Sequence, residues 1–111
     1  MKRPYSAYAN LSLAAFHYSK GDGEKGSRYL DKISDASFAA AGKYELLGDG
    51  YVKQGLTGEA IAAYERSLRI NSGQIKPRSK LIRLYGIRSP ELVQEARKDL
   101  AYIKSFYPAG R

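Results

Sequence analysis

Bulky apolar residues return every three, four or six positions along much of this 111-residue chain, and glycine interrupts the pattern at short intervals. Residues 38–54 form one such stretch, with a predicted helical face made by Phe38, Tyr44, Leu47, Tyr51 and Val52. Gly55 ends this stretch, and a second runs from Glu59 to Ile70. The two-residue alternation of strands is missing, so the sequence predicts an all-α protein of short helices.

Four more helices are predicted around this pair, over residues 7–20, 24–33, 77–86 and 89–107. Gly86 is expected to end the fifth helix, as Gly21 and Gly23 end the first. The sixth is expected to begin at Ser89, where a hydroxyl can cap the helix and the following proline loses no needed N–H group. It is expected to stop at Pro108, which gives six helices in three hairpins.

The middle hairpin carries a recognisable spacing, Tyr44-x-x-Leu47-Gly48-x-x-Tyr51 followed by Ala60-x-x-x-Tyr64. This spacing resembles the tetratricopeptide repeat, which is about 34 residues long. A glycine inside a helix costs ~1 kcal/mol relative to alanine, so Gly48 requires a packing reason. We expect Gly48 and Ala60 to be small because the two helices of the hairpin approach each other closely there.

The resemblance implies antiparallel helix hairpins stacked as a short right-handed α-solenoid. Its units would span about residues 7–40, 41–74 and 75–108 of a single domain over residues 1–111. The match is strongest in the middle unit. Such stacks normally close with a helix that has a polar outer face, and none follows Pro108. The chain is therefore expected to be a piece of a longer protein or to cover its end by forming a homo-oligomer.

In the resembled family, the first helix of each hairpin lines a groove that holds an extended peptide or a helix of another protein. The resemblance thus implies a non-catalytic scaffold for protein–protein interaction. The positions that would line the groove are Tyr8, Leu11, Ser12, Ala15, Glu45, Asp49, Lys53, Lys76, Lys80 and Arg83. They change from apolar to basic along the chain, so the expected partner has an apolar segment followed by acidic residues.

The net charge of +8 comes mostly from residues 75–111, which carry nine basic and three acidic side chains. One alternative is therefore binding of nucleic acid or another polyanion by Lys76, Arg78, Lys80, Arg83 and Arg88. These residues do not share one helical face, so nucleic acid is the less favoured ligand. A further alternative is an oligomerisation or spacer module of a larger assembly.

Residues for catalysis or metal binding are scarce. The chain has no cysteine, and its only histidine, His17, has no acidic partner at a short helical spacing. The Gly21–Gly26 string matches G-x-G-x-x-G, but a predicted helix precedes it where a dinucleotide site needs a strand. We expect no enzyme activity, cofactor or metal, and no apolar run reaches the ~18 residues of a membrane span. The partner and the compartment stay open, with the cytoplasm favoured.

Overall fold

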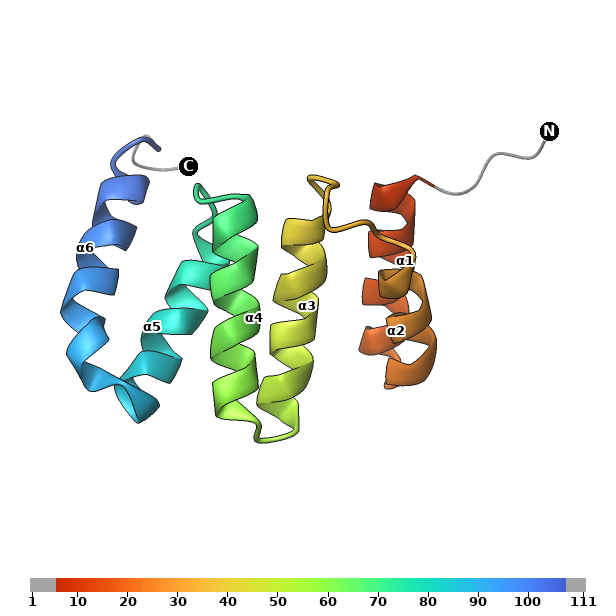
Figure 1. The fold of residues 1–111 in the computed structure, drawn as a ribbon, viewed down its shortest axis with the longest axis horizontal. Helices are drawn as coiled ribbons and strands as arrows, with labels where there is room; N and C mark the ends of the chain where they lie inside the picture. Colours follow the sequence, from red (N-terminus) through yellow and green to blue (C-terminus); the bar gives the residue numbers. More distant parts are fainter. Residues whose placement is uncertain (1–5, 108–111) are drawn as a thin grey trace.

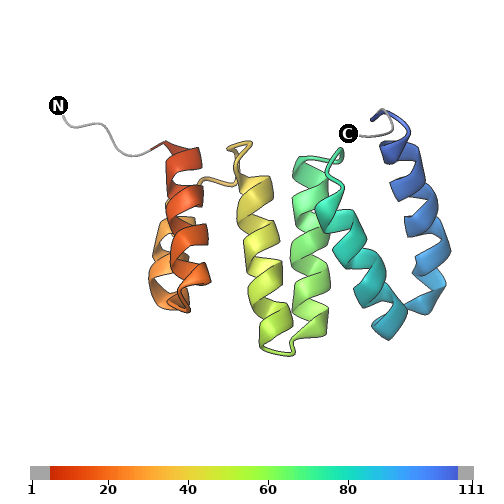
Figure 2. The ribbon, with the colours of Figure 1, turned by 180° about the vertical axis from the view of Figure 1, so that it is seen from behind.

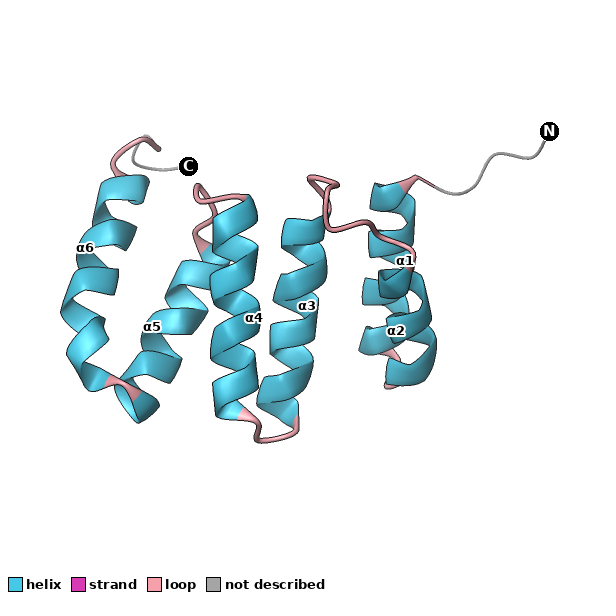
Figure 3. Ribbon diagram, in the orientation of Figure 1, coloured by secondary structure: helices cyan, strands magenta, loops and turns pink. Residues whose placement is uncertain are grey.

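The computed structural model describes residues 6–107. Within this range the chain forms helices and no strand, which confirms the all-α prediction (Figure 3). The helices are α1 (Ala7–Ser19), α2 (Gly23–Asp31), α3 (Ala40–Lys53), α4 (Thr57–Ile70), α5 (Lys76–Arg88), the 3₁₀ turn η1 (Pro90–Leu92) and α6 (Val93–Lys104). Successive helices pair as α1 with α2, α3 with α4, and α5 with α6.

The three hairpins follow one another along the molecule, which measures 50 × 33 × 26 Å (Figure 1). Helices α1 and α2 lie at one end and α6 lies at the other, as the reverse view also shows (Figure 2). Helix α5 packs on both α4 and α6, whereas the first hairpin contacts the second through α1 and α3. The result is a short α-solenoid in which each hairpin contacts its neighbours in sequence.

Glycine turns close the first two hairpins. Gly21 and Gly55 have φ angles of 81° and 76°, a left-handed conformation that side chains disfavour and that ends a helix cleanly. After the first turn, Asp22 caps α2 by accepting a hydrogen bond from the Lys25 amide at 3.1 Å. Both helix stops predicted from glycine are confirmed at these positions.

The middle hairpin closes around small residues, as predicted. A Cβ atom added at Gly48 would lie 2.5 Å from Cε1 of Tyr64, so only glycine lets the tyrosine ring lie against α3. Ala60 is fully buried in the same helix pair. Ser67, also fully buried, donates a 2.7 Å hydrogen bond from its hydroxyl to the Ala41 carbonyl. These contacts hold α3 and α4 together.

The core has two clusters of buried residues. The first joins the α1–α2 hairpin to the start of α3 and consists of Ala14, Leu30, Ile33, Ala39 and Ala40. The second lies between α4 and α5 and consists of Ala60, Tyr64, Leu81, Leu84 and Tyr85. Helix α6 contributes no buried residue, although Val93 and Ala96 pack against the second cluster. The last hairpin is therefore the least enclosed.

Two residues of the predicted α3 face are placed differently. Phe38 was expected on the helical face with Tyr44 and Leu47, but it lies in the turn before α3 and is 63% exposed. The helix begins two residues later, at Ala40, so the helical spacing does not apply to Phe38. Val52 is 45% exposed near the other end of α3. The helical face is thus shorter than the sequence predicted.

The junction between α5 and α6 also departs from prediction. Helix α5 does not end at Gly86 but continues to Arg88, because Gly86 does not adopt the positive φ that ends a helix at Gly21 and Gly55. The Ser89 side chain makes no capping hydrogen bond, and the chain enters α6 through η1. The predicted stop at Pro108 lies outside the described residues.

Candidate partner-binding surface

Lys80 joins the first helices of the second and third hairpins. Its Nζ atom donates hydrogen bonds from α5 to Glu45 Oε2 at 2.7 Å and to Asp49 Oδ1 at 3.0 Å on α3. Glu45 and Asp49 face the same way because they are four residues apart on one helix. On α4, Tyr64 donates its hydroxyl to Asp49 Oδ1 at 2.5 Å. One charged network therefore connects α3, α4 and α5.

Lys80 and Tyr64 of this network, and the neighbouring Tyr85, have shifted pKa values. Burial alone would lower the pKa of Lys80, but the hydrogen bonds to Glu45 and Asp49 outweigh it, so the pKa is raised. The pKa of Tyr64 is raised by burial and by its hydrogen bond to Asp49. Burial and a hydrogen bond to Glu65 raise the pKa of Tyr85 in the same way. These groups stay protonated in neutral solution.

These shifts predict a loss of stability in alkali. A group whose pKa is raised by folding contributes stability below its unfolded pKa, and this contribution is lost as pH rises through the folded value. The free energy of unfolding should therefore fall above pH 10.0, the ordinary pKa of tyrosine. Urea titrations from about pH 8 to pH 11 would measure the slope. Tyr64→Phe/Tyr85→Phe should flatten it, and an equally steep slope in this variant would contradict the assignment.

The predicted groove residues of α1 divide into two groups. Tyr8 is 58% exposed, and Ser12 and Ala15 are exposed on the same side of the helix. Leu11 is partly buried and lies against Gly42 of α3, where an added Cβ would be 2.6 Å from Leu11 Cδ2. Leu11 therefore packs between the first two hairpins.

The charged groove residues also divide into two groups. Lys80 forms ion pairs with Glu45 and Asp49, so these three side chains are already paired. Lys53, Lys76 and Arg83 are exposed, and none of them forms an ion pair with residues 6–107. Four cations against two carboxylates leave this set with a net charge of +2. The surface is therefore basic although its central lysine is neutralised.

A cavity of 440 Å³ lies beside this charged set. Glu45 and Lys76 line it together with Asn71 and Gln74 from the α4–α5 loop. Tyr107, from the segment after α6, also lines it. No sequence pattern predicted this cavity, because its lining combines the α4–α5 loop with Tyr107, which is more than thirty positions away.

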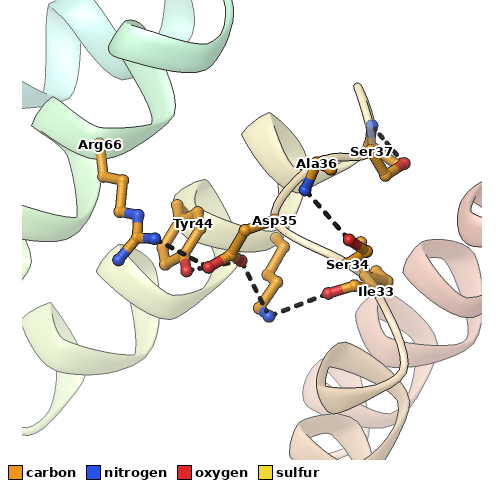
Figure 4. Close-up of polar contacts among 9 residues, drawn as sticks. Ile33, Ser34, Asp35, Ala36, Ser37, Tyr44 and Arg66 are labelled. Atoms are coloured by element: carbon orange, nitrogen blue, oxygen red, sulfur yellow. Dashed lines mark hydrogen bonds and ion pairs between the residues drawn. The ribbon is translucent and has the colours of Figure 1, made fainter.

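Asp35, in the loop between α2 and α3, is a second polar centre (Figure 4). Its carboxylate accepts hydrogen bonds from the Tyr44 hydroxyl and from the Arg66 guanidinium, both at 2.7 Å. Lys43 approaches Asp35 at 3.4 Å and donates a 3.1 Å hydrogen bond to the Ile33 carbonyl. The bond from Tyr44 is the largest cause of a lowered pKa of Asp35. Asp35 thus ties the end of the first hairpin to α3 and α4.

Comparison with known protein families identifies the family to which this chain is similar. The family described as tetratricopeptide repeat-like domain matches residues 2–84, more than half of the chain. The chain belongs to this family. No match was found among curated proteins or among solved structures. The matched range ends at Leu84 within α5, so η1 and α6 of this tetratricopeptide-like array lie outside it.

Membership of the tetratricopeptide-like family indicates a protein–protein interaction scaffold, and such repeats are typically non-catalytic. Across residues 6–107, no group of three or more potential ligand side chains could hold a metal ion. The same part of the chain contains no helix with the length and hydropathy to cross a bilayer. His17 stacks on Tyr29 with ring centroids 5.4 Å apart, so its ring packs between α1 and α2.

The basic residues of the third tetratricopeptide-like hairpin diverge. Arg78 folds back and donates a 2.8 Å hydrogen bond to the Ser72 carbonyl. Lys80 points to α3, and the Arg88 guanidinium lies beside Gly58 at the start of α4. Phosphate binding by all of them together would require these side chains to leave their present contacts.

Proposed function

We propose that this tetratricopeptide-like array binds an extended peptide or a helix of a partner protein along the outward side of α1, α3 and α5. We call this side the first-helix surface; it comprises Tyr8, Ser12, Ala15, Glu45, Asp49, Lys53, Lys76, Lys80 and Arg83, with Leu11 at the packed junction of α1 and α3. The observation that carries the proposal is the Lys80 network. It links α5 to α3 with hydrogen bonds of 2.7 and 3.0 Å and leaves Lys76 and Arg83 exposed.

The chemistry of this surface favours a partner with an apolar segment followed by acidic residues. On α1, the exposed Tyr8 and Ala15 offer apolar contact. On α5, Lys76 and Arg83 are available for charge-assisted hydrogen bonds to carboxylates. The 440 Å³ cavity beside Lys76 is large enough for a ligand group, since ligand pockets begin at roughly 300 Å³.

A peptide library selected on the immobilised protein tests this proposal. Selected sequences should contain acidic residues on one side of an apolar segment. Their affinity for Lys76→Glu/Arg83→Glu should fall by about tenfold or more, because the charges then repel the ligand. Titration of one selected peptide into each protein by calorimetry would measure the change.

The matched control is Lys20→Glu/Lys25→Glu, which changes the net charge equally at exposed positions near the start of α2. It should keep nearly full affinity at about 0.15 M salt, where distant surface charges are screened. Equal losses in both variants would reduce the effect to net charge and contradict a defined surface. Tight, steeply salt-dependent binding of an oligonucleotide would instead favour the polyanion alternative.

A further inference from the structure

An open notch runs along α3, lined on one side by the first hairpin and on the other side by α4. Helix α2 has nine residues, whereas α4 has fourteen. Two cavities of 230 and 360 Å³ lie on either side of the shared residues Leu47 and Tyr51 of α3. We call the two together the inter-hairpin notch. None of the residues that line it belongs to the first-helix surface.

The inter-hairpin notch combines an apolar centre with carboxylates. Leu47 and Tyr51 are only partly buried, so they present apolar area to a ligand. The charged residues in the lining are Glu24, Glu59 and Arg66. Arg66 is already bound to Asp35 and Glu24 to Arg28, while Glu59 forms no ion pair with any residue from 6 to 107. The notch is thus suited to an apolar group with a positive charge beside it.

Helix α6, at the end of the molecule away from the first hairpin, and the turn that follows it carry a group of this kind (Figure 1). Tyr102 and Phe106 are 66% and 65% exposed and pack edge to face with ring centroids 5.1 Å apart. Lys98 and Lys104 lie on the same helix within one turn or so of these rings and are exposed. Two adjacent exposed aromatic rings, one on a helix without any buried residue and one in the turn that follows it, indicate a contact surface.

We propose that the inter-hairpin notch of one copy receives Tyr102 and Phe106 of a second copy. The aromatic rings contact Leu47 and Tyr51, and the lysines of α6 lie near Glu59. The notch is lined by residues of α1 to α4, whereas α6 packs on α5 and η1 at the far end of the array, so a molecule does not fill its own notch (Figure 1). The contact is head to tail. An assembly of any number of copies therefore keeps a free notch at one end and a free α6 at the other.

Two blocked variants test this contact without disturbing the core. Gly50 lines the notch, and a Cβ added there meets no atom within 4 Å, so Gly50→Leu fills the notch while α3 stays intact. Tyr102→Asp/Phe106→Asp removes the aromatic group from an exposed face. Sedimentation velocity should show concentration-dependent association of the wild type and at least about tenfold weaker association of each variant.

Mixing the two blocked variants gives the decisive result. One retains a working α6 and the other a working notch, so the mixture should form a 1:1 complex and nothing larger. Gly86→Leu is the matched control for added bulk, because Gly86 is also helical with no atom near its Cβ position. Ile87→Asp, at a residue 71% exposed, is the control for added charge. Both controls should associate like the wild type.

Three results would overturn the proposal. The first is a wild-type protein that stays monomeric up to about 1 mM, where even millimolar contacts register. The second is a mixture of the blocked variants that forms no complex, which would point to a symmetric contact between two copies of α6. The third is a loss of association in Gly86→Leu equal to that in Gly50→Leu.

Discussion

Replacing Gly48 by alanine should destabilise the protein by about 1–3 kcal/mol, the usual cost of forcing extra volume into a packed core. The new Cβ would lie 2.5 Å from Cε1 and 2.7 Å from Cδ1 of Tyr64. Tyr64 cannot move easily, because it is only 2% exposed and its hydroxyl is bound to Asp49. Urea denaturation followed by circular dichroism would measure the loss of unfolding free energy.

The control for Gly48→Ala lies two residues away on the same helix. Nothing lies within 4 Å of a Cβ at Gly50, so Gly50→Ala should stabilise the protein by about 0.5–1 kcal/mol through helix propensity. Adding Tyr64→Leu to Gly48→Ala should cost less than the sum of the single changes, because the shorter side chain removes the clash. If Gly48→Ala and Gly50→Ala behave alike, close packing of α3 on α4 is not the reason for Gly48.

Replacing Leu30 by alanine should cost about 2–5 kcal/mol, the range for truncating a buried leucine. Leu30 is 1% exposed and is the main side chain that α2 contributes to the first buried cluster. Neighbours such as Ala14 are too small to fill the space. Thermal and urea unfolding would give the change.

Leu92→Ala is the comparison for Leu30, since the same chemical change is made at a residue 42% exposed. Its expected cost is below about 1 kcal/mol, because much of the side chain already contacts water. A similar loss in both variants would show that α2 does not depend on this buried cluster.

Much of the hairpin architecture could be predicted from the sequence because local rules determine it. Gly21 and Gly55 end helices in the left-handed conformation, and Gly48 and Ala60 allow one close helix contact. Gly86 shows the limit of the same rule. Gly86 stays helical because its neighbours Leu84 and Tyr85 are buried in the core and hold this part of α5 in place.

The charged network could have been inferred from the repeat length. Lys80 is 34 positions after Leu46, and equivalent positions of successive repeats lie side by side, so Glu45 and Asp49 are its natural neighbours. The contacts of Asp35 had no such signal. They depend on the path of an irregular loop, which brings its carboxylate to Tyr44 and to Arg66, thirty-one residues away.

The open packing of α6 has a consequence for how the protein opens. Because α6 contributes no buried side chain, separating it from α5 exposes little apolar area and costs less free energy than separating α3 from α4. Amide protons of α6 should then exchange with deuterium through local fluctuations, long before those of the central helix pair. Unfolding would begin as fraying at one end, and a ligand held on α6 would slow exchange there first.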